Sequence, residues 1–90
     1  MSVFPRRQVV NLYEPVKFFC NASGHPKPTI SWHKTRGNLP VYHYVKPTYL
    51  QLPSVKKEDG GMYVCRAENS NGVQEEIVEL TVNGTFSFHI

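Results

Sequence analysis

The chain has 90 residues, which suits one small domain and lies near the lower limit for a hydrophobic core that folds unaided. Ten Lys or Arg residues against seven Asp or Glu residues give a formal net charge of +3. No apolar stretch reaches the roughly 18 residues that suggest a membrane-spanning helix, and no segment keeps a helical period. The composition therefore argues against a helical or membrane-spanning domain and predicts one β-rich unit without membrane contact.

The first clear strand lies around Cys20. Side chains on a strand alternate between two faces, so Val16, Phe18 and Cys20 share an apolar face. Lys17 and Phe19 then point the other way, toward solvent. The pattern predicts a half-buried strand with Cys20 on its core side.

The next strand is expected to carry Trp32, the only tryptophan of the chain. Prolines at positions 26 and 28 keep the preceding turn extended, because proline fixes φ and disfavours helix in the residue before it. Between Trp32 and Leu50 the chain leaves room for one brief strand, such as residues 41–45, and for no extra hairpin.

In residues 62–67 the same alternation points Tyr63 and Cys65 inward. The Tyr63 hydroxyl can then donate a hydrogen bond back to the main chain at the turn that begins at Asp59.

A hairpin is predicted at Asn71 and Gly72, the strongest short turn signal in the chain. It would lead into a last strand over residues 78–82.

Cys20 and Cys65 are thus both expected in the middle of a strand, on its apolar face. Two such strands in facing sheets can bring their sulfur atoms together, with the indole of Trp32 beside them. Closing this loop would stabilise the fold by roughly 4 kcal/mol in the chain-entropy treatment. A pair of buried free thiols is the alternative.

In these features the chain resembles an intermediate-set immunoglobulin domain over residues 9–82. Four segments in register carry the resemblance: residues 20–32, 50–55, 59–65 and 65–72. It implies an all-β fold, a two-sheet antiparallel immunoglobulin-like sandwich with an inter-sheet disulfide between Cys20 and Cys65, and a core that includes Trp32, Tyr63 and Leu52. Residues 1–8 would then be a leader to the first strand, and residues 83–90 a linker or tail.

One departure from the family pattern lies at the turn before the Cys20 strand. The family usually has a glycine just before the acidic residue there, whereas this chain has Tyr13 before Glu14 and Pro15. An unusual turn is expected at this point.

The compartment follows from two features of the sequence. A disulfide in the core needs an oxidising environment. Asn21-Ala22-Ser23 and Asn83-Gly84-Thr85 are both acceptor sequences for N-glycosylation, so Asn21 and Asn83 are candidate glycan sites. Together they favour a secreted or cell-surface protein.

Catalytic and cofactor sites are not indicated by the sequence. The four histidines, at positions 25, 33, 43 and 89, show no paired spacing for a metal, and the cysteines are expected to be bridged. No glycine-rich phosphate loop precedes a helix. We therefore expect no enzyme activity, no metal or other cofactor and no nucleic-acid partner.

Charge is distributed unevenly along the chain. Residues 1–57 contain nine Lys or Arg and only Glu14, whereas residues 58–90 contain Arg66 and six Asp or Glu. A basic face would attract heparan sulfate or another glycosaminoglycan, or an acidic protein patch, and Lys56 and Lys57 are candidate contacts. The alternative is a solvated surface of mixed charge.

Exposed aromatic residues suggest a second candidate surface. Phe19 is expected on the solvent side of its strand, with Tyr42 and Tyr44 nearby and Lys17 and Lys46 flanking them. Exposed tyrosine beside a base is favoured at protein interfaces. Alternatively, these rings fold over the edge of the sandwich as ordinary cover.

Two classes of function follow from the resemblance. The first is a non-catalytic protein-binding or adhesion module of an extracellular multidomain protein, with a protein partner, possible glycosaminoglycan contacts and neighbouring domains of the same chain. The second is a structural module of an intracellular muscle or cytoskeletal protein, similar to titin or palladin.

Overall fold

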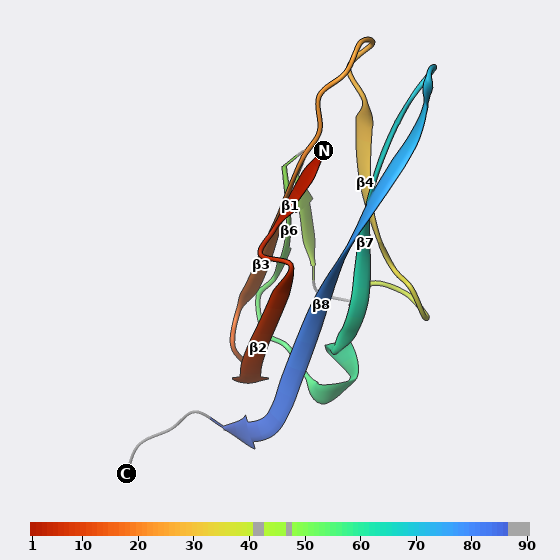
Figure 1. Cartoon of the computed structure of the whole chain (residues 1–90). Coiled ribbons are helices and arrows are strands. Elements are labelled where there is room, and N and C mark those ends of the chain that lie inside the picture. Colours follow the sequence, from red (N-terminus) through yellow and green to blue (C-terminus); the bar gives the residue numbers. More distant parts are fainter. Residues whose placement is uncertain (41–42, 47, 87–90) are drawn as a thin grey trace.

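The computed structural model describes residues 1–40, 43–46 and 48–86. Its strands form two four-stranded sheets that stack face to face (Figure 1). Sheet 1 has the order β1-β3-β6-β5, built from Ser2–Phe4, Val16–Asn21, Tyr49–Leu52 and Tyr44–Lys46. Sheet 2 has the order β2-β8-β7-β4, built from Arg7–Leu12, Gly72–Phe86, Gly61–Asn69 and Thr29–Lys34.

A single 3-10 turn, η1, spans Lys57–Asp59, and the described residues contain no α-helix. In the same part of the chain, no helix has the length and apolar character that crossing a membrane requires. The predicted all-β sandwich is therefore confirmed.

The core lies between the sheets and follows from the alternation along each strand. In β3 the buried residues Val16, Phe18 and Cys20 alternate with three exposed ones, as the sequence pattern predicts. Trp32, Tyr63 and Leu52 are also buried. The Phe18 ring lies 6.4 Å from that of Trp32 and 6.2 Å from that of Tyr63, so aromatic side chains from both sheets meet at the centre.

The inter-sheet disulfide is present between Cys20 and Cys65, whose Cα atoms lie 6.5 Å apart. It joins β3 of sheet 1 to β7 of sheet 2. Tyr63, two residues before the second cysteine, donates its hydroxyl hydrogen bond to the carbonyl oxygen of Asp59. Burial raises the pKa of Tyr63 well above its ordinary value, and the negative charge of Asp59 raises it further.

The N-terminal segment differs from the leader expected for residues 1–8. Ser2–Phe4 forms β1 and pairs antiparallel with β3, and β2 already begins at Arg7. Val3 is buried in the core, which accounts for the pairing. Because Pro5 lies between the two strands and has no amide hydrogen, the first strand divides there and its halves join different sheets.

The last strand is longer than the sequence suggested. β8 begins at Gly72 rather than at residue 78 and continues to Phe86, beyond the expected limit at residue 82. The hairpin turn consists of Ser70 and Asn71, and Gly72 (φ +151°) pairs with Asn69. The turn was therefore predicted one residue too late. The strand is longer because exposed residues at its start also pair with β7, up to Asn69 opposite Gly72, beyond the part of β8 that is buried.

Two local expectations can also be compared with the structure. The brief strand predicted near residues 41–45 is β5, Tyr44–Lys46, at the edge of sheet 1, whereas residues 41 and 42 lie outside the described residues. The unusual turn before β3 is confirmed, because Tyr13 has φ +68°, in the left-handed region that favours glycine.

Candidate functional site

The outer surface of sheet 1 carries a row of side chains that crosses all four strands. Phe4 of β1 lies opposite Phe19 of β3, Phe19 lies opposite Tyr49 of β6, and Tyr49 lies opposite Lys46 of β5. In the next row with this orientation, Gln51 of β6 lies between two residues that were predicted to be exposed, Lys17 and Tyr44. We call this surface the aromatic–basic face and define it by six residues: Phe4, Lys17, Phe19, Tyr44, Lys46 and Tyr49.

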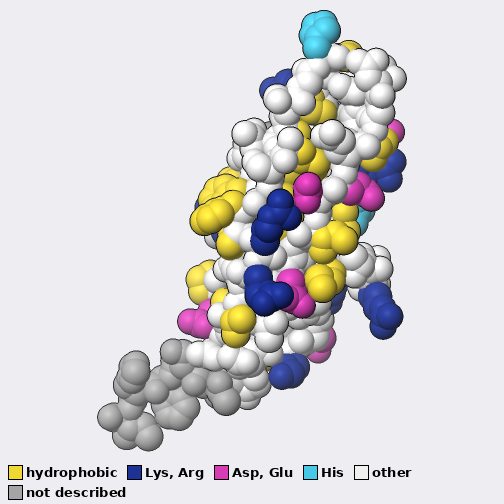
Figure 2. All heavy atoms as spheres, viewed as in Figure 1, with side chains coloured by type: hydrophobic (Ala, Val, Ile, Leu, Met, Phe, Trp, Pro, Cys, Tyr) yellow, Lys and Arg dark blue, Asp and Glu magenta, His cyan; other side chains and the backbone are white. Residues whose placement is uncertain are grey.

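The aromatic rings of this face are open to solvent rather than folded over the edge of the sandwich. Phe4 is 70% exposed, Tyr44 57% and Phe19 43%. In Figure 2 one group of hydrophobic side chains lies on the left-hand side of the molecule, where β1 and β3 lie in Figure 1, and others lie right of centre. Exposed apolar side chains grouped in this way often mark an interaction surface.

Lys17 makes cation–π contacts with two of the rings. Its Nζ atom lies 4.3 Å from the centre of the Tyr49 ring and 5.7 Å from that of Phe19. The two rings meet edge to face at 6.0 Å. A cation above an aromatic ring is favourable, so these contacts restrain side chains that would otherwise be mobile on the surface. The centre of the face is therefore an ordered cluster.

Charge on the aromatic–basic face is entirely positive. The four strands of sheet 1 contain Lys17 and Lys46 and no Asp or Glu. Neither lysine is within ion-pair distance of an acid among the described residues. The face therefore presents two unneutralised positive charges beside its rings.

The outer surface of sheet 2 has a different character, because its charges neutralise one another. On this surface Arg7 pairs with Glu79 at 2.9 Å, whereas Arg6, just before β2, pairs at 3.3 Å with Glu76, which lies opposite Cys65 on the other side of β8. Basic and acidic side chains accordingly lie next to each other over β2 and β8 in the centre of Figure 2. A shallow hollow beside these pairs is lined by Arg6, Arg7, Met62, Ile77 and Glu79.

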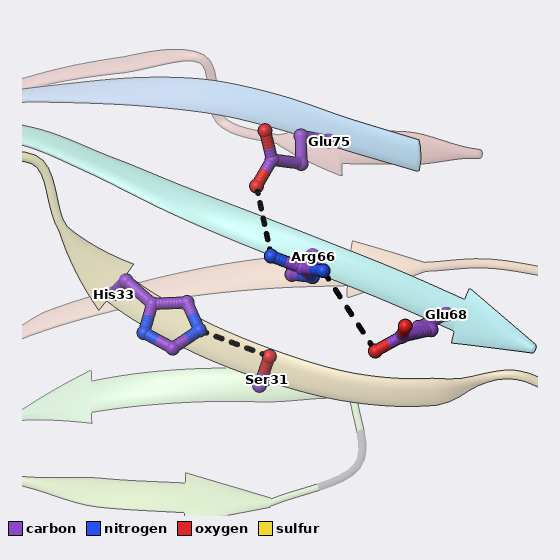
Figure 3. A network of polar contacts seen from close by, with 5 residues as sticks. All are labelled: Ser31, His33, Arg66, Glu68 and Glu75. Atoms are coloured by element: carbon purple, nitrogen blue, oxygen red, sulfur yellow. Dashed lines mark hydrogen bonds and ion pairs between the residues drawn. The ribbon is translucent and has the colours of Figure 1, made fainter. Parts of the chain in front are cut away.

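A second group of polar contacts lies farther along sheet 2 (Figure 3). Arg66 of β7 lies between Glu68, at 3.8 Å, and Glu75 of β8, at 4.0 Å. On the neighbouring strand β4, the Ser31 hydroxyl and the His33 ring nitrogen Nε2 lie 3.1 Å apart. The acids of the last strand, β8, therefore lie beside bases and neutralise them.

The residues predicted to bind a partner divide into two groups. Phe19, Tyr44, Lys17 and Lys46 share the aromatic–basic face, and Tyr42 lies outside the described residues. Phe4 was not among the residues predicted from the sequence, which indicated a leader over residues 1–8. Its strand, Ser2–Phe4, has only three residues, too few for an alternation to be recognised in the sequence.

Lys56 and Lys57 lie apart from that face, at the connection between β6 and β7. Both are exposed and precede two acids, Glu58 and Asp59. The Asp59 carboxylate accepts a hydrogen bond from the Lys56 amide at 2.8 Å. These adjacent acids reduce the positive field that the two lysines can present to a polyanion.

Both candidate glycan acceptors are exposed. Asn21 ends β3 on the same side as Phe19. Asn83 lies in β8, where its side-chain amide donates a hydrogen bond to the Asn11 side-chain oxygen at 3.3 Å. Among the described residues, no group of three His, Cys, Asp or Glu side chains is placed to hold a metal ion.

Comparison with known proteins agrees with the architecture. The family model for the immunoglobulin I-set domain matches residues 1–82. The chain is 44% identical over 63 residues to the mouse basement membrane-specific heparan sulfate proteoglycan core protein, a match that covers 70% of this chain and 2% of that protein. It is also 44% identical over 70 residues to human contactin-2, covering 77% of this chain and 7% of that protein.

Among solved structures, the N-terminal four immunoglobulin domains of Dscam1 isoform 6.9 superpose with a TM-score of 0.75 and 34% identity. That match covers 90% of this chain and 20% of the other. This chain therefore spans only a small part of each of these relatives. The paired sheets, the buried disulfide beside a tryptophan and the family match together place the chain in the immunoglobulin I-set family.

Proposed function

We propose that this chain is a non-catalytic binding module of an extracellular multidomain protein, and that its aromatic–basic face binds an acidic surface on a protein partner. The observation that carries this proposal is the composition of sheet 1, whose outer face combines exposed aromatic rings with two lysines and no carboxylate. Charge complementarity between such surfaces steers association and favours the correct partner.

A protein partner fits this face better than a glycosaminoglycan does. Only Lys17 and Lys46 supply positive charge in the four strands, whereas three rings, those of Phe4, Phe19 and Tyr44, are exposed. Aromatic residues are enriched at the centres of protein interfaces. Binding to a sulfated polysaccharide would depend chiefly on clustered bases, and the pair Lys56 and Lys57 lies beside acids.

An extracellular location is supported by the buried disulfide, which forms and persists in oxidising compartments. The relatives include a protein named for the basement membrane. At its two ends the domain would continue into neighbouring domains of the same protein, as suits a chain that covers so little of its relatives. A cytoskeletal role would instead require the domain to fold with Cys20 and Cys65 as reduced thiols.

Cell adhesion to a surface coated with the secreted domain tests the proposal. The wild-type domain is compared with a Lys17→Glu, Tyr44→Ser variant, which changes the aromatic–basic face. The matched control is Arg7→Glu, Ile77→Ser, which makes the same change of charge and a similar apolar-to-serine change on the exposed surface of sheet 2. We expect adhesion to fall at least tenfold for the first variant and less than twofold for the second.

Enzymatic treatment of the cells identifies the class of partner. Loss of adhesion after protease, with little change after heparinase, is the result expected for a protein partner. Loss after heparinase alone would replace it with heparan sulfate. Equal adhesion of both variants, or none by the wild type, would contradict the proposed surface.

A further inference from the structure

We propose that Asn21 carries an N-linked glycan whose first N-acetylglucosamine packs against the ring of Phe19. The acceptor sequence is Asn21-Ala22-Ser23, in which both Asn21 and Ser23 are exposed. The proposal rests on the extracellular location proposed above, but it does not depend on the identity or existence of a protein partner.

The strand geometry places the sugar and the ring together. Asn21 and Phe19 are two positions apart on β3, so their side chains leave the same face of sheet 1, roughly 7 Å apart along the strand. The residue opposite Asn21 on β1 is Ser2, which is small and exposed. A sugar attached to Asn21 is about as wide as this spacing, and the small Ser2 leaves room for it on the β1 side.

The Phe19 ring provides an apolar platform at that distance. It is 43% exposed, and Phe4, opposite it on β1, is 70% exposed. One face of a glucosamine ring consists of C–H groups, which are attracted to the negative face of an aromatic ring and lose contact with water when they cover it. The glycan would therefore cover apolar surface that is otherwise left in solvent.

The second acceptor sequence lacks this arrangement and serves as an internal comparison. Asn83 has Thr81 two positions before it, and both are exposed on β8. Moreover, the Asn83 amide is hydrogen-bonded to Asn11. A glycan at Asn83 would therefore have no aromatic ring two residues away on its own strand.

This glycan would cover one part of the aromatic–basic face and leave the rest exposed. Its first sugar would lie over Phe19, at the end of β3 that carries Asn21. Lys17, Tyr44 and Lys46 lie on the other side of Phe19 or on strands farther from β1. They would remain open to a partner.

The experiment uses four secreted proteins, all with Asn83→Gln so that only Asn21 can be modified. They combine an intact or a Ser23→Ala acceptor sequence with Phe19 or Phe19→Thr, which gives the Asn21 site the same neighbour as Asn83 has. Glycopeptide mapping measures occupancy at Asn21, and an endoglycosidase then trims the glycan to one sugar. Thermal unfolding of the four proteins forms a double-mutant cycle for the sugar and the ring.

We expect Asn21 to be occupied, and the single sugar to raise Tm by roughly 4 °C when Phe19 is present. With Phe19→Thr the increase should fall below roughly 1 °C. The N-acetyl methyl signal should also shift upfield in NMR spectra only when Phe19 is present, because the ring current of phenylalanine acts at that distance.

Secretion of the folded domain without sugar at Asn21 would overturn the assigned site, while leaving partner binding untouched. An equal rise in Tm with Phe19 and with Phe19→Thr would overturn the packing of sugar on ring. Cell adhesion does not enter either readout, so failure of this inference is distinguishable from failure of the proposed function.

Discussion

The two outer surfaces of the sandwich differ in whether their charged side chains form ion pairs. On sheet 2, Arg7 and Arg66 each lie within 4.0 Å of a glutamate on the same surface. On sheet 1, Lys17 turns to the rings of Phe19 and Tyr49 instead, since the strands contain no acid. A surface that neutralises its own charges attracts an ionic partner weakly, whereas the aromatic–basic face keeps its positive charge available for one.

The difference between the surfaces follows from the order of strands along the chain. Apart from Glu14, every acid lies after residue 57, and three of them are in β8. β8 pairs with β2 and β7, so the chain topology brings those acids to the bases of sheet 2. Sheet 1 is built only from segments before residue 53. An asymmetry along the sequence thus becomes an asymmetry between two layers.

The largest predicted effect is a difference in stability between variants on the buried side and the exposed side of sheet 1. Phe18 is fully buried and Phe19 is 43% exposed, although they are adjacent in β3. Phe18→Ala should lower the free energy of unfolding by about 3–5 kcal/mol, because it leaves a cavity in the core. Phe19→Ala should lower it by less than about 1 kcal/mol. Urea unfolding of both variants measures this, and similar losses would mean that the aromatic–basic face is needed for folding.

A smaller effect is expected at the tyrosine that anchors β7. Tyr63→Phe removes the hydrogen bond to the Asp59 carbonyl oxygen and should cost about 1–2 kcal/mol at neutral pH. Because folding raises the pKa of Tyr63, the unfolded chain ionises first as pH rises. Stability that is fully present below about pH 10 should therefore decline above it.

The Phe variant provides the control for that pH dependence. Its stability should decline less steeply above pH 10 than that of the wild type. Unfolding curves with the same slope against pH in both proteins would exclude Tyr63 as the cause.

At the turn before β3, the stability of variants at position 13 should depend on which backbone conformations the new residue allows. Because Tyr13 has φ +68°, Tyr13→Gly should be more stable than Tyr13→Ala by about 1 kcal/mol. The two variants lack the same tyrosine ring, so their difference in unfolding midpoint isolates the backbone. An alanine variant as stable as the glycine variant would show that this turn relaxes to another conformation.

The smallest effect compares single charges on the two surfaces. Lys17→Gln and Arg7→Gln change the net charge equally, but Arg7 is paired with Glu79 and Lys17 has no acid on its sheet. Elution from a heparin column should move to lower salt by a larger step for Lys17→Gln. Equal steps would indicate that net charge, rather than its arrangement, governs attraction to an anion.

Much of this architecture was predictable, because it depends on alternation that a sequence displays directly. The burial of Phe18 beside exposed Phe19, the bridge between the cysteines and the Tyr63 corner all follow from period-two patterns and spacing. The turn at Tyr13 was expected to be unusual because a glycine was missing.

The pairing of β1 with β3 and the extension of β8 were not predictable in the same way. Three residues, Ser2–Phe4, are too few to show a pattern, and they become a strand only because β3 offers a free edge. Which acids meet which bases likewise depends on register between strands far apart in sequence. Most residues of the aromatic–basic face could therefore be predicted to be exposed, but the sequence did not show which of them lie side by side. Phe4 was not predicted to belong to the face at all.

The central claim is that the unneutralised face of sheet 1 is where this domain binds. Residue-resolved NMR during titration with a polyglutamate peptide, used as an acidic polypeptide probe at low salt, tests it most directly. We predict that the amide shifts cluster on β3, β5 and β6, around Lys17, Tyr44 and Lys46. Shifts concentrated instead on β4, β7 and β8, or at Lys56 and Lys57, would contradict the account.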